Sequence, residues 1–333
     1  MDDARETDDL GLGVTAPRRR VSYVLPVYNE EQNIAVFHAA LVEATDARPD
    51  LDFEFVYVDD GSRDDSLARL LKLRGDDDRV SVLSFSRNFG HQVAVTAGLD
   101  AVGDADAVVV MDTDLQDPPR VSLEMLQMWE GGVDVVFAQR RSRKDSPFKR
   151  ATAFGFYWVL DRMADIEIPR NVGDFRLMDR KVVAEVSRYR EQDRFLRGIV
   201  AHVGFRQEAL LFDRDPRYAG ETGYPLRKMI KFAASGIVGF STAPLRWISR
   251  LGFAISAFSV LLALYVLGVR IFRPEESVPG WAFLGVGMFL LSGLQLIMMG
   301  VIGTYLGRVY AEAQDRPLYS LALTARGARD DTR

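Results

Sequence analysis

Short apolar runs and amphipathic stretches alternate along the first two thirds of the chain. Five runs are rich in β-branched and aromatic residues and have the length of buried strands: Val21–Leu25, Phe53–Val58, Val80–Phe85, Ala107–Met111 and Val133–Ala138. The stretches between them carry apolar residues at helical spacing: Glu31–Thr45, Asp64–Leu73, His91–Ala101 and Arg120–Trp129. This alternation predicts an α/β domain, at residues 21–224, with a mostly parallel sheet covered by helices on both faces.

Two long runs without a charged residue follow, from Leu251 to Val269 and from Trp281 to Leu306. Each approaches or exceeds the ~20 helical residues that cross a bilayer core of about 30 Å. Because Pro274 and Pro279 separate the runs, we expect a hairpin of two transmembrane helices within residues 248–308. The alternative is a pair of helices buried in a large soluble core, but such helices seldom run this long without a charge.

Basic and apolar residues mix in residues 225–247, just before the hairpin. This composition is typical of amphipathic helices in the lipid headgroup layer, although a helix packed on the globular domain would show the same periodicity. Residues 1–20 change from acidic to basic without an apolar stretch, so we expect a disordered arm and no signal peptide. Residues 309–333 form a C-terminal tail in this interpretation.

Charge and composition narrow the function. The formal net charge is −5, so the chain lacks the basic excess of nucleic-acid-binding proteins. It has no cysteine, which excludes disulfides, thiol nucleophiles and thiolate metal sites. Lys and Arg counts on the two sides of the hairpin nearly tie, so the positive-inside rule adds little. The missing signal peptide favours a catalytic domain in the cytoplasm.

Three predicted strands end in polar loops, and the carboxyl ends of parallel strands are where ligands bind in such sheets. These loops are Pro26–Glu30, Asp59–Ser62 and Asp112–Pro119. Crowded carboxylates would repel a nucleotide's phosphates unless a divalent cation bridges the two. Asp112 and Asp114 offer oxygen ligands of the kind that Mg²⁺ or Mn²⁺ prefers. A lone Asp-x-Asp is also common in capped turns, so the constellation counts more than the pair.

The order of the motifs along the chain is more specific than any one of them. They are PVYNE, VDDGS, SRNFGHQVAVTAG, MDTDLQDPP, GDFRLMDRKVV, RFLRG, RYAGETGYPL and FSTAPLR. This series, from Val21 to Leu318, closely resembles the family-2 glycosyltransferases with the Rossmann-like GT-A fold. Within that family it is similar to polyprenyl-phosphate glycosyltransferases, the relatives of bactoprenol glucosyltransferases and dolichol-phosphate mannose synthases. It resembles the bactoprenol glucosyltransferases more than the mannose synthases.

The resemblance implies a donor site at the strand ends. The residues expected around the base and ribose are Pro26, Tyr28, Glu30, Val58 and Asp60. Carboxylates accept hydrogen bonds from an imide or from hydroxyls, and a tyrosine ring offers a stacking face. Asp60 also fits a simple turn with the neighbouring glycine in a strained conformation.

Asp112, Asp114 and Gln116 are implied to hold the metal and the donor pyrophosphate, and Thr113 to contribute backbone contact. The catalytic residues implied are Asp114, Asp174 and Arg140. Asp174 would lie near the reacting phosphate as a general base, or would orient Arg176 or the acceptor. His91 receives no role, since a lone histidine is more often structural.

The acceptor phosphate is expected on Arg140, Arg150 and Arg217, because the guanidinium fork binds phosphate oxygens in two parallel bonds. The alternative is that the basic run from Arg140 to Arg150 only attracts anionic lipid. The chain has Gly223 where relatives commonly carry a lysine, so one expected phosphate contact is missing.

The reaction that the resemblance implies is inverting transfer of a hexose from a nucleotide-sugar to undecaprenyl or decaprenyl phosphate, for envelope glycan modification. The donor expected first is UDP-glucose. UDP-N-acetylhexosamine and GDP-mannose remain alternative donors. The expected setting is a multi-pass protein of the bacterial cell membrane, a homo-oligomer that is a tetramer by resemblance. A processive synthase is disfavoured because Ala243 stands where its Q-x-x-R-W motif requires Gln. A catalytically silent scaffold or flippase partner is the alternative of another class.

Overall fold

A computed structural model describes residues 18–141, 172–213, 243–272 and 280–327. Its centre is an eight-stranded sheet in the order β7-β5-β6-β4-β1-β2-β3-β8. The strands are β1 (Arg20–Val27), β2 (Asp52–Asp59), β3 (Val80–Phe85), β4 (Ala107–Val110), β5 (Val135–Arg140), β6 (Val172–Asp179), β7 (Gln207–Phe212) and β8 (Leu321–Ala325). The neighbours β4, β1, β2 and β3 are parallel, which confirms the predicted mostly parallel sheet.

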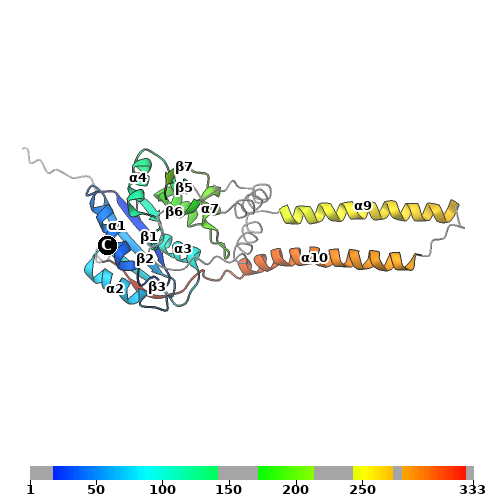
Figure 1. Cartoon of the computed structure of the whole chain (residues 1–333), viewed down its shortest axis with the longest axis horizontal. Coiled ribbons are helices and arrows are strands. Elements are labelled where there is room, and N and C mark those ends of the chain that lie inside the picture. Colours follow the sequence, from blue (N-terminus) through cyan, green and yellow to red (C-terminus); the bar gives the residue numbers. More distant parts are fainter. Residues whose placement is uncertain (1–17, 142–171, 214–242, 273–279, 328–333) are drawn as a thin grey trace, which may run out of the picture.

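Helices cover both faces of the sheet (Figure 1). They are α1 (Ile34–Asp46), α2 (Ser66–Asp76), α3 (His91–Ala101), α4 (Pro119–Glu130), α6 (Arg180–Val186) and α7 (Leu196–His202). Side chains on β1 alternate between two buried clusters: Tyr23 and Leu25 pack with α1 and α4, whereas Val24 packs with α3 and α6. Strands buried on both faces explain why the runs are continuously apolar.

Three of the eight strands were not among the five predicted from the sequence: β7 pairs parallel with β5, whereas β6 and β8 are antiparallel. β6 pairs antiparallel with both β4 and β5, and it holds the polar motif GDFRLMD, which lacks the continuous apolar run that marked the other strands. Its register sets Val110 opposite Arg176. The first residues of β6 therefore lie at the carboxyl ends of the parallel strands, where ligands bind.

Two long helices project side by side from the α/β domain (Figure 1): α9 (Ala243–Phe272) and α10 (Trp281–Ala313). Each contains an apolar window long enough to cross a membrane, with none of that window buried. A methyl group added at Gly252 of α9 would lie 3.6 Å from Met298 of α10. The two uncharged runs thus form two long helices, as the expected hairpin requires, and both helices extend beyond those runs. Residues 225–242 and most of the 1–20 arm lie outside the described residues.

The segment after α10, which the sequence analysis assigned to a C-terminal tail, returns to the sheet. β8 pairs antiparallel with the edge strand β3, and Tyr319 stacks on Phe85 with ring centroids 5.3 Å apart. The backbone amide of Gly327 donates to the Ser81 hydroxyl at 3.0 Å. The sheet is therefore completed by residues that follow the apolar helices.

Candidate active site

The loops after β1, β2 and β4 are joined to one another at the carboxyl edge of the sheet. Asn29, in a left-handed conformation with φ 54°, donates its backbone amide to Ser62 at 2.9 Å. Its side chain accepts from the backbone amide of Arg63, also at 2.9 Å. The Thr113 hydroxyl donates to the carbonyl of Pro26 at 3.4 Å. The sequence prediction that three strand ends share one edge is confirmed by these contacts.

Glu30 and Tyr28 lie on the first of these loops. The Glu30 carboxylate accepts a 2.5 Å hydrogen bond from Asn33, and its backbone amide donates to Ser66 at 2.9 Å. Tyr28 is exposed, so its ring is available for stacking. Val58 is fully buried in the core, so its side chain offers no surface to a ligand.

Asp60 organises the approach to α3. Its carboxylate accepts from the backbone amides of Phe89 at 2.7 Å and Gly90 at 3.0 Å, and from the Asn88 amide at 2.8 Å. Burial raises the pKa of Asp60, and the two backbone hydrogen bonds partly offset that effect. Asp60 thus braces the loop before α3, and whether it also contacts a base stays a prediction.

Gly61 has a positive φ of 65°, and a Cβ there would lie 2.5 Å from the carbonyl carbon of Arg87. The strained turn considered from the sequence is therefore present, and it allows the β2 loop to touch the β3 loop.

The Asp112–Gln116 turn follows β4. Asp114 is buried and accepts from the backbone amide of Gln116 at 3.1 Å, while Leu115 between them has a φ of 60°. A left-handed leucine is strained, and such strain gathers at functional sites. Asp112 is more accessible, with 36% of its side chain exposed. The described residues contain no group of three or more metal-ligating His, Asp or Glu side chains. Two carboxylates still fit Mg²⁺, which is usually held by one or two carboxylates with substrate phosphates and water.

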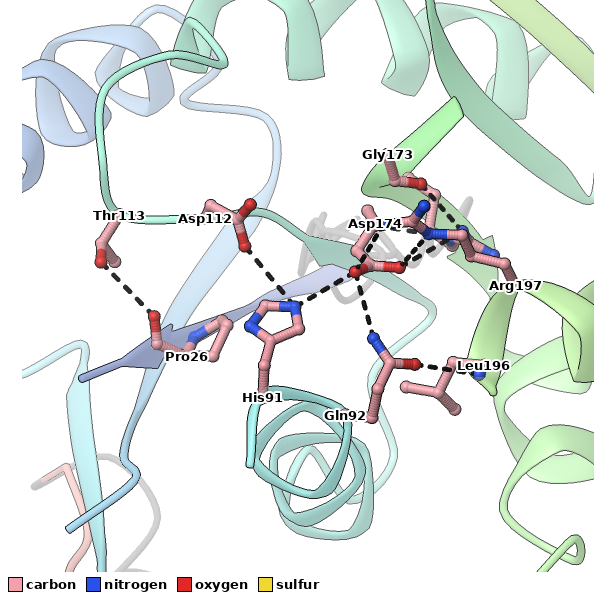
Figure 2. A network of polar contacts seen from close by, with 10 residues as sticks. Pro26, His91, Gln92, Asp112, Thr113, Gly173, Asp174, Leu196 and Arg197 are labelled. Carbon is pink, nitrogen blue, oxygen red and sulfur yellow. Dashed lines mark hydrogen bonds and ion pairs between the residues drawn. The ribbon is translucent and has the colours of Figure 1, made fainter. Parts of the chain in front are cut away.

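Asp174, the third residue of β6, is the centre of a charged cluster (Figure 2). Its carboxylate accepts from Arg197 at 2.8 and 3.1 Å, from Gln92 at 3.1 Å and contacts His91 at 3.2 Å. The Arg176 guanidinium lies 3.8 Å away. Burial opposes ionisation of Asp174, but His91 and Arg197 hold its pKa well below the usual value. Asp174 is therefore an anion that neighbouring cations compensate.

His91 links Asp174 to the Asp112 turn, since its Nε2 also lies 3.7 Å from Asp112 (Figure 2). Burial disfavours the charged ring, yet the hydrogen bond with Asp174 and the charge of Asp112 raise the pKa of His91 to about 9. His91, Gln92 and Arg197 are site residues to which the sequence analysis gave no role. The motifs SRNFGHQ and RFLRG contain them, but only the fold brings these motifs together.

Arg140 ends β5 beside the same cluster, because a Cβ added at Gly173 would lie 3.9 Å from its guanidinium. The structure thus gathers Asp112, Asp174 and Arg140 near one edge of the sheet. Arg150 and Arg217, the other two residues predicted to bind the acceptor phosphate, lie outside the described residues.

Comparison with known proteins identifies this arrangement. Residues 22–187 match the model of glycosyl transferase family 2. The uncharacterized glycosyltransferase YkcC of Bacillus subtilis (strain 168) is 47% identical over 299 residues, which cover 90% of this chain and 92% of that one. The SfII prophage-derived bactoprenol glucosyl transferase of Shigella flexneri is 37% identical over 310 residues, which cover 92% and 99%. The chain belongs to glycosyl transferase family 2. This membership confirms that it is a glycosyltransferase.

The GT-A type of sheet expected for a family-2 glycosyltransferase is present, with the polar loops at the carboxyl ends of β1, β2 and β4. Among solved structures, the mannosyltransferase PcManGT from Pyrobaculum calidifontis, in complex with GDP-Man and Mn²⁺, aligns with a TM-score of 0.43 at 16% identity. The alignment covers 87% of this glycosyltransferase and 88% of that chain.

Proposed function

We propose that this glycosyltransferase moves glucose from UDP-glucose to polyprenyl phosphate with inversion at the sugar's C1. The observation that carries the proposal is the meeting of two unlike sites at one sheet edge. The acidic Asp112–Gln116 turn suits a metal-bound pyrophosphate, and the Arg140 side of the Asp174 cluster suits a second phosphate. The 37% identity to proteins named bactoprenol glucosyl transferase spans both the sheet and the two apolar helices and supports the same acceptor.

On the donor side, Pro26, Tyr28, Glu30 and Asp60 surround the base and ribose in this proposal, with Val58 contributing only its main chain. Asp112, Asp114 and Gln116 hold Mg²⁺ or Mn²⁺ against the diphosphate. When bound, the ion neutralises the charge of the leaving UDP. Thr113 fixes the turn to the β1 loop, so the metal side and the base side keep their spacing.

On the acceptor side, Arg140, Arg150 and Arg217 bind the lipid phosphate. An oxygen of that phosphate attacks C1, the bond from C1 to the UDP oxygen breaks, and the opposite approach gives a β-linked product from an α-linked donor. A phosphate monoester with a second pKa near ~6 is largely ionised at neutral pH. A general base is therefore unnecessary, and the low pKa of Asp174 makes that carboxylate a weak one. Asp174 serves instead to hold Arg197 and Arg176.

The proposed setting is a bacterial cell membrane that α9 and α10 both cross, with residues 225–247 in the headgroup layer and the α/β domain in the cytoplasm. A lipid phosphate cannot leave the bilayer surface, so its partners must stay near it. The proposed boundaries are residues 21–224 for catalysis and 248–308 for the spans. A homotetramer is the assembly we propose.

The test is incubation of the purified protein with short-chain polyprenyl phosphate and radiolabelled UDP-glucose, UDP-N-acetylglucosamine or GDP-mannose. We expect lipid-linked label from UDP-glucose above the other donors, and a β-anomeric product by NMR. An α-linked product would contradict the inversion, and a preference for another donor would contradict the sugar assignment. Absence of both transfer and UDP-sugar hydrolysis would favour the silent scaffold.

A further inference from the structure

The loop between α6 and α7 touches the end of α10. Arg308 of α10 forms an ion pair with Asp193 of the loop at 2.6 Å. One turn later, Glu312 accepts the backbone amide of Gln192 at 2.8 Å. The Gln192 side chain donates to the carbonyl of Arg316 at 2.6 Å. Three contacts thus fasten two adjacent loop residues to the segment that leaves the apolar helix.

A second attachment joins the same loop to the strand that follows α10. Arg190 donates to the Asp100 carboxylate at 2.8 Å, and the Tyr319 hydroxyl donates to the same oxygen at 2.9 Å. Asp100 lies in the last turn of α3. The loop is therefore held at Arg190 as well, by a residue that also contacts the approach to β8.

The other end of the loop enters the active site. Phe195 is followed directly by α7, whose first residue, Leu196, donates its backbone amide to Gln92 at 3.0 Å. Gln92 in turn donates to Asp174 at 3.1 Å, and Arg197 makes two hydrogen bonds to the same carboxylate (Figure 2). Asp193 contacts α10 and Arg197 contacts Asp174, and only three residues separate Asp193 from Arg197 along the chain.

We propose that the end of α10 is a positioning element of the active site, acting through the loop Arg190–Phe195 on Arg197 and Gln92 and so on Asp174. The proposal rests on the proposed function, because it assigns the apolar helix a part in acceptor transfer. Exposed ion pairs contribute little to stability, and Asp193 is 57% exposed. A short loop pinned at both ends, however, has few conformations left. Small misplacements of catalytic groups lower the reaction rate strongly. These contacts therefore act on the rate by holding Arg197 in place.

The first experiment reverses the charges of the Arg308–Asp193 ion pair in the full-length protein in detergent. Arg308→Glu and Asp193→Arg are each compared with the double variant, in which the pair is restored with opposite polarity. Arg188→Glu is the matched control, because Arg188 lies near the loop and, among the described residues, forms an ion pair with the partly exposed Glu185 alone. For each single reversal we expect kcat/KM for polyprenyl phosphate to fall about fivefold, the upper range for an exposed pair, with KM for UDP-glucose unchanged. The double variant should return to within about twofold of wild type, and the control should match wild type.

Two further measurements separate positioning from simple fastening. If α10 acts through Arg197, then Arg308→Glu should add little to the loss already caused by Arg197→Lys. Hydrogen exchange of the Leu196 amide should be faster in Arg308→Glu and in the uncharged variant Gln192→Ala than in Arg188→Glu.

The proposal would be overturned if the losses of kcat/KM in Arg308→Glu and Arg197→Lys were additive, or if the exchange rate of the Leu196 amide did not change. It would also be overturned if KM for UDP-glucose rose as much as KM for polyprenyl phosphate. Wild-type protein that transfers no sugar to polyprenyl phosphate would instead overturn the proposed function. In that case the exchange measurement still decides whether α10 holds the loop.

Discussion

Replacing Asp174 by asparagine keeps the shape of the side chain and removes the one negative charge that Arg197, Arg176 and His91 share. The two hydrogen bonds from Arg197 lose their ionic partner, and the asparagine amide would turn a donor toward other donors. Asp174 is only 8% exposed, so water cannot replace what is lost. We therefore expect both the stability of the α/β domain and the transfer rate to fall.

The size of the effect follows from burial. At an effective dielectric constant of ~20, opposite charges ~3 Å apart attract by about 5 kcal/mol. Measurements on buried pairs that lose one partner give about 3–5 kcal/mol. For a domain of this size, about 2–4 °C of melting temperature corresponds to each kcal/mol, so we expect a decrease of ~6–20 °C. Asp104→Asn is the matched control, since Asp104 is 59% exposed and pairs with Arg20 at 3.2 Å; it should cost less than ~1 kcal/mol.

The assay is thermal unfolding of the detergent-solubilised variants, followed by transfer to polyprenyl phosphate at pH 6 and pH 8. Because the pKa of Asp174 is held well below its usual value, the carboxylate is ionised at both pH values, and its contribution is lost only under strongly acidic conditions. The loss of rate should therefore appear at both. A variant that melts within about 2 °C of wild type and keeps the full rate would refute a central role for this charge.

Four other predictions concern the metal, the acceptor site and the stability of the domain. Excess EDTA should abolish transfer, and Asp112→Asn should do so without unfolding the domain; undiminished turnover in EDTA would show that no metal is needed. Arg140→Lys should lower kcat/KM for polyprenyl phosphate tenfold or more, about 1.4 kcal/mol, while UDP-glucose KM stays constant. Gly61→Ala should destabilise the domain because its φ is positive and its Cβ would meet the Arg87 backbone; a melting temperature unchanged from wild type would contradict this. Burial lowers the pKa of His38, so the unfolded state of that residue binds more protons and its own contribution to stability falls as pH drops between about pH 7 and 5; in denaturant titrations over that interval, His38→Gln should therefore lose less stability on acidification than wild type does.

The parallel half of the fold was predictable because its signals are local. β3 and α3 have the bounds expected from the sequence, and the other predicted strands and helices are displaced by at most a few residues. Each is a continuous apolar run or an amphipathic stretch, which sequence periodicity detects directly. The two apolar helices were predictable for the same reason, since their length and the absence of charge define them.

The antiparallel strands had no such signal. β6 carries Asp174 and Arg176, both buried, and the partners that stabilise the Asp174 carboxylate include His91 and Gln92, which lie far along the chain. β8 has only five residues and depends on β3, more than two hundred positions earlier. For the same reason His91 resembled an ordinary structural histidine, because its partner Asp174 is 83 positions away. Pairings of this kind are set by the tertiary fold and do not appear in a local pattern.

The reversal of β6 also explains why a cation stands between the two halves of the site. Because β6 runs against β4, its beginning meets the end of β4, and two carboxylates, Asp112 and Asp174, come to the same edge. Two neighbouring carboxylates would repel each other, and they would also repel an incoming phosphate. His91 contacts both, at 3.7 and 3.2 Å, and Arg197 balances Asp174 from the other side. Under the proposed function, the histidine therefore lets the acidic turn that suits a metal-bound diphosphate and the arginines near Asp174 that suit a second phosphate share one edge of the sheet.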